Sequence, residues 1–172
     1  METKKDFTLD EKDLRILELL QEDSSQPIKT IASDEGVKLA IPTVHERIRK
    51  MKEYGIIKKY TVILDDKKLG KDVTAFIGIT LDFKAHEPDV AVPYEVAKMK
   101  DVLEVFNLAG DEDHLIKVKT EHISTLETII RTINRIPGVG RTRSIIVLST
   151  EKEDTALSLE KELENAEDNV RR

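Results

Sequence analysis

Basic side chains gather between residues 38 and 59, where seven Lys or Arg stand against two Glu in a chain of formal net charge −6. Many of them fall in "PTVHERIRKMKEYG" (42–55), a segment with helical periodicity. Cations on an open helix face neutralise phosphates and release counterions, and the start of such a helix reaches base edges in the major groove of DNA. We therefore expect double-stranded DNA as a partner, with contacts from Thr43, His45, Arg47, Arg49, Lys50 and Lys52. A solvated helix surface would carry the same charges, so the neighbouring elements must decide.

Those elements favour a small helical DNA-binding domain over residues 8–64. "LDEKDLRILELLQED" (9–23) and "IKTIASDEG" (28–36) have apolar residues at helical spacing, and "SSQP" separates them. Val44, Ile48 and Met51 give the basic segment its own apolar face, Pro42 suits its first turn, and Gly55 ends it. The β-branched run "IIKKYTVILD" (56–65) predicts a strand after the third helix. Three short helices followed by a strand indicate a winged helix-turn-helix.

A different periodicity follows the polar segment 65–72, which we interpret as a linker. Every second residue of "VTAFIGITLDF" (73–83) is apolar, which predicts a strand. A helix is expected over 90–100, two strands over 102–110 and 113–120 joined at "GDED", a helix over 122–136 and a strand over 141–149. The order β-α-β-β-α-β over residues 73–150 predicts a ferredoxin-like domain, so the fold class is α+β.

One face of such a sheet carries no helix, and a second copy of the chain would cover it. We therefore expect a homo-oligomer, at least a dimer and plausibly a tetramer or octamer. Residues 151–172 carry many charges and sparse leucines at helical spacing, which predicts a charged helical tail.

The composition argues against several other classes. The chain has no cysteine, so it lacks a disulfide framework and thiolate sites. The sequence shows no apolar run of membrane-spanning length and no apolar leader, so a membrane role is not expected and a cytoplasmic location follows. It has no phosphate-binding Gly loop, no G-x-S-x-G and no H-E-x-x-H, so we expect no enzyme, no cofactor and no metal centre. The acids and histidines at 112–114 and 121–122 leave a metal-sensing repressor as an alternative.

Four segments in order resemble the Lrp/AsnC (leucine-responsive, feast/famine) family of transcriptional regulators. They are "LDEKDLRILELLQED", "ERIRKMKEYGIIKKYTVILDDKKLG", "LAGDEDHLIKVKT" and "IPGVGRTRSIIVLS", and the likeness spans residues 8–150. It implies a helix-turn-helix followed by a RAM-type ligand domain. The chain departs from the family where "IASDEGVKLAIPT" (31–43) is longer than usual. The family's turn glycine aligns near Lys38, and Ala40 stands where a serine commonly caps the third helix. The tail after Thr150 is a further departure.

The resemblance also implies an amino-acid effector bound between subunits, near the acidic hairpin and the last strand. The matching residues here are Gly110, Asp111, Glu112, Asp113, Thr142, Arg143 and Ser144. A zwitterion needs acceptors for its ammonium group and donors or a cation for its carboxylate, which these residue types supply. Glu112 replaces a residue that is often aromatic in the family, and an amine-bearing effector is one hypothesis for it.

Two other interpretations remain open. The "GDED" segment could be an ordinary polar hairpin turn. The chain could also be an effector-independent DNA-organising protein whose C-terminal domain only oligomerises, in which case weak sequence preference and a steep salt dependence are expected.

Overall fold

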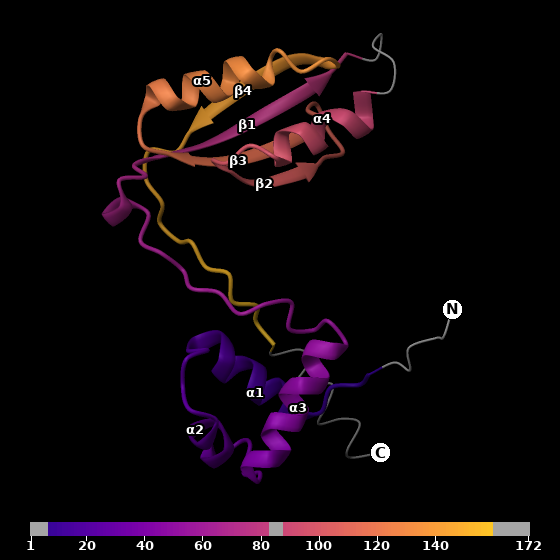
Figure 1. The fold of residues 1–172 in the computed structure, drawn as a ribbon, viewed down its shortest axis with the longest axis vertical. Helices are drawn as coiled ribbons and strands as arrows, with labels where there is room; N and C mark the ends of the chain where they lie inside the picture. Colours follow the sequence, from indigo (N-terminus) through magenta and orange to yellow (C-terminus); the bar gives the residue numbers. More distant parts are fainter. Residues whose placement is uncertain (1–6, 83–87, 160–172) are drawn as a thin grey trace. The chain divides into compact units, whose positions relative to one another are not determined.

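The computed structural model describes residues 7–82 and 88–159, which fall into two compact units (Figure 1). The first unit comprises the described residues up to Val62 together with those from Glu153 onward, and the second comprises Ile63–Lys152. Each unit has its own apolar core. The second unit is therefore inserted, in sequence, between two parts of the first.

Three helices build the first unit: α1 (Glu11–Glu22), α2 (Ile28–Ser33) and α3 (Ile41–Glu53). α1 begins at Asp10, whose side chain accepts a hydrogen bond from the backbone of Asp13 while the Asp13 side chain accepts one from the backbone of Asp10. This reciprocal pair satisfies two of the N–H groups that a helix start leaves without partners. The core joins all three helices around fully buried side chains such as Ile16, Ile31 and Met51. The helix-turn-helix prediction is confirmed.

The turn between α2 and α3 is unusual at two positions. Lys38 adopts a left-handed conformation with φ of 43°, the region that glycine adopts most readily. Such a backbone costs most side chains free energy because Cβ approaches the following carbonyl. Ala40 is the N-cap of α3 and provides no side-chain hydrogen bond, because its methyl group has no acceptor. The first turn of α3 therefore lacks a side-chain cap, although the amides of Thr43 and Val44 donate to the carbonyl of Ala40.

The predicted strand over residues 56–65 is wrong. Gly55, with φ of 78°, ends α3, and the amides of Ile56 and Ile57 then donate to the carbonyl of Met51. Among the residues that the structure describes, no backbone–backbone hydrogen bond involves residues 58–64. A strand exists only as part of a ladder, and no strand among the described residues pairs with this segment. The apolar side chains of Val62, Ile63 and Leu64 are consequently exposed.

The tail prediction is also wrong over residues 151–159, which are irregular rather than helical. The side chain of Gln21 donates to the carbonyl of Leu157 at 3.1 Å and accepts from its amide at 2.8 Å. These two bonds, which we call the Gln21 clip, hold the returning chain against α1. The remainder of the predicted helix, 160–172, lies outside the described residues.

The second unit begins with residues that the sequence suggested were a linker. A short 3₁₀ turn, η1 (Lys67–Leu69), ends at Gly70 in the left-handed conformation. Lys71 bonds Asp101 at 2.9 Å and Glu121 at 2.6 Å, and Asp66 pairs with Lys119 at 2.7 Å. These ion pairs fasten the segment to the sheet of its own unit.

The sheet contains β1 (Val73–Leu81), β2 (Val102–Asn107), β3 (His114–Thr120) and β4 (Val139–Ile146) in the order β2-β3-β1-β4, all antiparallel. The helices α4 (Pro88–Ala97) and α5 (Ile123–Ile133) cover one face. The predicted β-α-β-β-α-β order and α+β class are confirmed.

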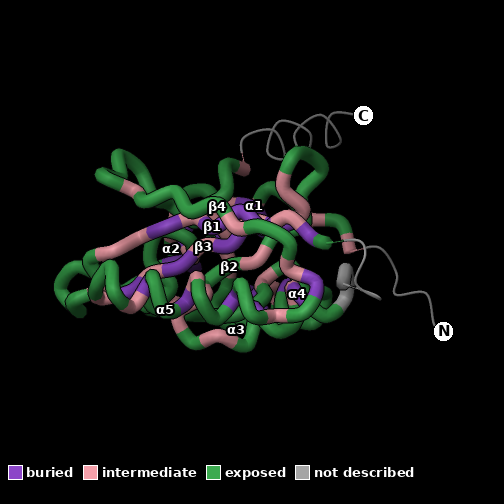
Figure 2. The backbone as a smooth tube through the Cα atoms, turned by 90° about the horizontal axis from the view of Figure 1, so that it is seen from above, coloured by how far each residue is buried: buried purple, intermediate pink, exposed green. Residues whose placement is uncertain are grey.

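Alternation along the strands explains which face is covered. Ala75, Ile77 and Ile79 of β1 point to the helices with Ile116 and Val118 of β3. Figure 2 shows these buried stretches along β1 and β3. The face opposite α4 and α5, here called the open face, carries apolar and charged side chains on directly paired positions. Its apolar members are Phe76, Phe106, Leu115 and Ile145.

The uncapped start of α3 yields a stability prediction. In Ala40→Ser, the new hydroxyl can accept a hydrogen bond from an amide in the first turn of α3. We expect the free energy of unfolding to rise by about 1 kcal/mol, measured by urea denaturation followed by circular dichroism. Ala40→Val is the matched control, since it adds volume without an acceptor. An equal gain in both variants would contradict the capping argument.

Candidate functional site

The six residues predicted to contact DNA all lie on α3, but their side chains have different surroundings. Thr43 and His45 are exposed in the first half of the helix. Lys50 and Lys52 are exposed in the second half, and the ammonium group of Lys52 lies 4.4 Å from the centre of the Tyr60 ring. The two arginines are each bound by carboxylates of the same unit.

Arg47 connects α3 to the start of α1. Its Nη1 donates to Asp10 Oδ2 at 2.6 Å and to Asp13 Oδ1 at 2.8 Å. The Asp13 side chain is only 4% exposed, so it is a buried charge that needs a cation. Burial alone would lower the pKa of Arg47, but the hydrogen bonds to Asp13 and Asp10 outweigh it and raise that pKa. Arg47 is therefore a part of the fold.

For the acid Asp10 the effect of burial has the opposite sign, and burial alone would raise its pKa. The hydrogen bonds from Arg47 and from the backbone of Asp13 outweigh this and lower that pKa overall. The capping pair at the start of α1 and the guanidinium from α3 thus form one connected cluster, here called the Arg47 cluster. This cluster fixes how α3 lies against α1.

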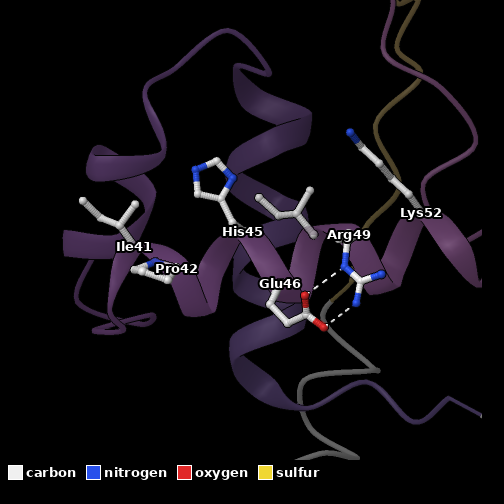
Figure 3. Close-up of a pocket in the computed structure, with 7 residues that line it drawn as sticks. Ile41, Pro42, His45, Glu46, Arg49 and Lys52 are labelled. Carbon is white, nitrogen blue, oxygen red and sulfur yellow. Dashed lines mark hydrogen bonds and ion pairs between the residues drawn. The ribbon is translucent and has the colours of Figure 1, made fainter.

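Arg49 forms the second bound group, with two glutamates of its own helix. Its Nε donates to Glu46 Oε2 at 2.8 Å and its Nη2 donates to Glu46 Oε1 at 2.6 Å (Figure 3). Its Nη1 bonds Glu53. The hydrogen bonds to Glu46 raise the pKa of Arg49, and they lower the pKa of Glu46. All of these side chains are about half exposed, so water and salt weaken the pairs.

Two shallow depressions flank the exposed surface of α3. One is lined by Ile41, Pro42, His45, Glu46, Ile48, Arg49 and Lys52. The other is lined by Phe7, Thr8, Asp10, Asp13, Pro42, Thr43, Glu46, Arg47 and Lys50. The helix thus projects as a ridge that carries hydroxyl, imidazole, ammonium, guanidinium and carboxylate groups. Such a ridge can enter a groove of DNA and meet both phosphates and base edges.

The second candidate site begins at the turn between β2 and β3. Asp113 has a structural role there, because its amide donates to the carbonyl of Ile79 and its carboxylate accepts from the amide of Leu81 at 2.7 Å. Gly110 and Asp111 are exposed at the tip of the turn. The predicted ligand residues therefore include one carboxylate that already holds β1 to the turn.

Glu112 lies over Gly78 on the open face. A Cβ at position 78 would stand 2.7 Å from Glu112 Cδ, so glycine is what lets this carboxylate lie on the strand. Arg143, paired across the sheet with Gly78, has its Nη1 3.8 Å from Glu112 Oε1. The structure thus brings together an anion and a cation from the predicted set.

Thr142 and Ser144 do not join them. Their register partners on β1 are Ile79 and Ile77, which point to the helices, so both residues lie on the opposite face from Arg143. Thr142 donates to the side chain of Asn134 at the end of α5, at 3.0 Å. Within one chain, Glu112 and Arg143 therefore lie on the open face, Thr142 and Ser144 lie on the helix-covered face, and Gly110, Asp111 and Asp113 lie in the turn.

His114, which the sequence offers as a metal ligand, is buried against the helices instead. It is 4% exposed, its Nδ1 lies 2.9 Å from Asn107 Oδ1, and its buried Nε2 has no hydrogen-bond partner among the residues that the structure describes. His114, Ile116 and Val118 are alternate residues of one predicted strand, so the sequence already predicts that His114 faces the helices with them. The pair with Asn107 joins the last residue of β2 to the first residue of β3, next to the acidic turn.

Residues 7–82 and 88–159 contain neither a candidate membrane-spanning helix nor a candidate metal site. No helix in these ranges is both long enough and apolar enough to cross a membrane. Over the same ranges, no group of three or more His, Asp or Glu side chains is arranged to hold a metal ion. The metal-sensing alternative therefore has no candidate cluster in this part of the chain.

Comparison with known proteins gives matches over both units. The AsnC-type helix-turn-helix domain matches residues 9–52, and the Lrp/AsnC ligand binding domain matches residues 74–157. The HTH-type transcriptional regulator FL11 of Pyrococcus horikoshii is 38% identical over 151 residues, which cover 88% of this chain and 97% of that protein.

Two solved structures are also similar. A transcriptional regulator of Neisseria meningitidis, solved as its L-Met complex, has a TM-score of 0.84 at 27% identity and covers 91% of this chain and 100% of its own. Escherichia coli AsnC has a TM-score of 0.78 at 30% identity and covers 87% of this chain and 99% of its own.

The Arg47 cluster generates a prediction about folding. Arg47→Ala leaves the buried Asp13 carboxylate without its cation, so we expect the free energy of unfolding at pH 7 to fall by about 1–3 kcal/mol. Urea denaturation followed by circular dichroism measures it. Arg49→Ala, an exposed change on the same helix, should alter stability by less than about 0.5 kcal/mol. Equal losses of unfolding free energy in the two variants would contradict a structural role for Arg47.

The same variant has a defined pH dependence. The pKa of Asp10 is lower in the folded protein than its ordinary value of 3.8. The stabilisation is therefore fully present above pH 3.8 and is lost as the pH falls through the lower, folded-state value. The stability difference between the wild type and Arg47→Ala should shrink in that acid range.

Proposed function

Because the chain belongs to the Lrp/AsnC family of transcriptional regulators, we propose that it binds specific DNA sites through α3 and that an amino acid, or a related metabolite, bound between subunits modulates this binding. The observation that carries the first part is the exposed ridge of α3 with its hydroxyl, imidazole and ammonium groups. A DNA-binding role agrees with the cytoplasmic location expected from the sequence.

Roles on α3 follow from the surroundings of each side chain. Thr43 and His45 are exposed near the start of the helix, where base edges are within reach of a helix lying in the major groove. Lys50 and Lys52 contact phosphates, and Arg49 adds its positive charge beside them while it remains bonded to Glu46. Arg47 acts through the Arg47 cluster by holding α3 in place.

The proposed effector site centres on Glu112 and Arg143. A free amino acid carries an ammonium and a carboxylate, and these two side chains offer the opposite charges on one patch of the open face. The Neisseria relative was solved with L-methionine, which supports an amino acid as the ligand class. A second subunit would complete the site, since one chain brings only part of the predicted set together.

The open face supports self-association. Phe106 and Ile145 are 44% and 48% exposed there, among charged neighbours that alone would not keep them from water. The exposed run from Val62 to Leu64 adds apolar surface on a segment with unpaired backbone. Patches of this kind are covered in stable oligomers. We propose a dimer through the open face, with tetramers or octamers as higher assemblies.

DNA binding is tested by its salt dependence. Lys50→Ala removes one proposed phosphate contact per subunit, so binding to every sequence should weaken and the slope of log K against log salt should flatten by about 1 for each phosphate that is no longer neutralised. Fluorescence anisotropy with a selected site and with random DNA measures both. Lys100→Ala removes the same charge from the second unit and should leave the slope unchanged. If Lys50→Ala behaves like Lys100→Ala, α3 does not contact the backbone.

The effector is tested by a thermal-shift screen against the common amino acids, β-amino acids and polyamines. A ligand that prefers the native protein raises Tm. We expect one clear stabilising compound whose shift is lost in Glu112→Gln, and also in Gly78→Ala, because the added Cβ would displace Glu112. Glu104→Gln, which changes another open-face acid, is the matched control.

Absence of any shift at millimolar concentrations would contradict the sensing proposal. It would favour the alternative of an effector-independent DNA-organising protein whose second unit only joins subunits. Analytical ultracentrifugation of the same samples separates this outcome from a failure to assemble.

A further inference from the structure

Glu46 occupies the middle of the exposed ridge of α3. Only Glu46 and Pro42 line both of the depressions described above, one on each side of the helix. Figure 3 shows Glu46 beside Arg49, with His45 and Pro42 on the preceding part of the helix. When α3 lies in a groove, the crest of the ridge is the part that comes nearest to the bases.

An acid at this place opposes the general attraction of α3 for DNA. Phosphates repel a carboxylate, so Glu46 cannot add to the sequence-independent part of the binding. Glu46 also neutralises part of the positive charge of its neighbours, since Arg49 forms two hydrogen bonds to it and Lys50 Nζ lies 3.9 Å from Oε1. A residue that weakens the sequence-independent attraction to phosphates can still contribute through a contact that depends on the base sequence.

The carboxylate is held in a fixed direction. The two parallel bonds from Arg49, at 2.8 and 2.6 Å, restrict rotation of the Glu46 side chain, which is 47% exposed. Each carboxylate oxygen has two acceptor positions, so both oxygens can accept a further hydrogen bond. In the major groove, guanine offers acceptors, whereas cytosine offers an amino donor.

We propose that Glu46 is a base-selecting residue, whose carboxylate accepts a hydrogen bond from the exocyclic amino group of a cytosine in the major groove. Arg49 is its positioning residue: the guanidinium fork fixes the carboxylate and screens it from nearby phosphates. This inference rests on the proposed function, that α3 binds DNA. It assigns the selection of one base pair in each half-site to a single acidic side chain.

The test is selection of bound sequences from random duplex DNA, followed by Kd measurements on single-base-pair variants of the selected site. The wild type should select cytosine at one position of each half-site. In Glu46→Gln, the amide can pair with the N6 and N7 of adenine, so preference at that position should move from cytosine toward adenine. Discrimination for cytosine should fall at least about fivefold, the lower limit for one good base contact.

Two further variants separate base selection from charge. Glu53→Gln also removes a carboxylate bonded to Arg49, but Glu53 lines neither depression, so the base preference should be unchanged. Arg49→Lys keeps the charge but loses the two-bond fork. It should relax selection at the same position while the salt slope remains that of the wild type.

The outcomes are distinct. If the wild type selects a site and Glu46→Gln selects the same base at every position, the inference is overturned and the DNA-binding proposal stands. If Glu53→Gln changes the base preference as strongly as Glu46→Gln, the effect is one of charge and the inference is again overturned. If the wild type binds all sequences equally, sequence-specific binding itself fails, and the inference fails with it.

Discussion

The carboxylate of Asp13 is almost completely buried, and a charge in that position must be paired and hydrogen-bonded. The chain meets this requirement with Arg47, one of four Lys and Arg residues on α3. The position of α3 on α1 therefore depends on an electrostatic contact as well as on the apolar core. One of the six residues expected to contact DNA, Arg47, instead binds carboxylates within the fold. The other five side chains are exposed on α3.

Charge pairing also governs the surface of α3. Arg49 lies between Glu46 and Glu53, and Lys50 approaches Glu46. A helix neutralised in this way attracts phosphates less than its count of Lys and Arg suggests. Less general attraction leaves a larger share of the binding free energy to contacts that depend on sequence, which is what a regulator searching a long DNA requires.

Periodicity in the sequence predicted nearly all helices and strands, because alternation and helical spacing record which side of an element is buried. It failed at residues 56–65, where β-branched residues predicted a strand that has no partner strand in the described parts of the chain. It also could not reveal the Arg47 cluster, since a contact across more than thirty positions leaves no local pattern. The separation of Arg143 from Thr142 and Ser144 follows from strand alternation, whereas the position of Glu112 over Gly78 needed the register of β1 and β3.

The Gln21 clip has a consequence for the order of folding. It joins residues 136 positions apart, and closing a flexible loop of that length costs about 4 kcal/mol of chain entropy beyond a constant. Two hydrogen bonds contribute only about 1 kcal/mol each. The sheet shortens this loop, because Val147 bonds Thr74 and the two ends of the second unit therefore lie side by side. The clip is therefore favoured once the sheet has formed, and the protection of the Leu157 amide from hydrogen exchange should depend on whether the second unit is folded.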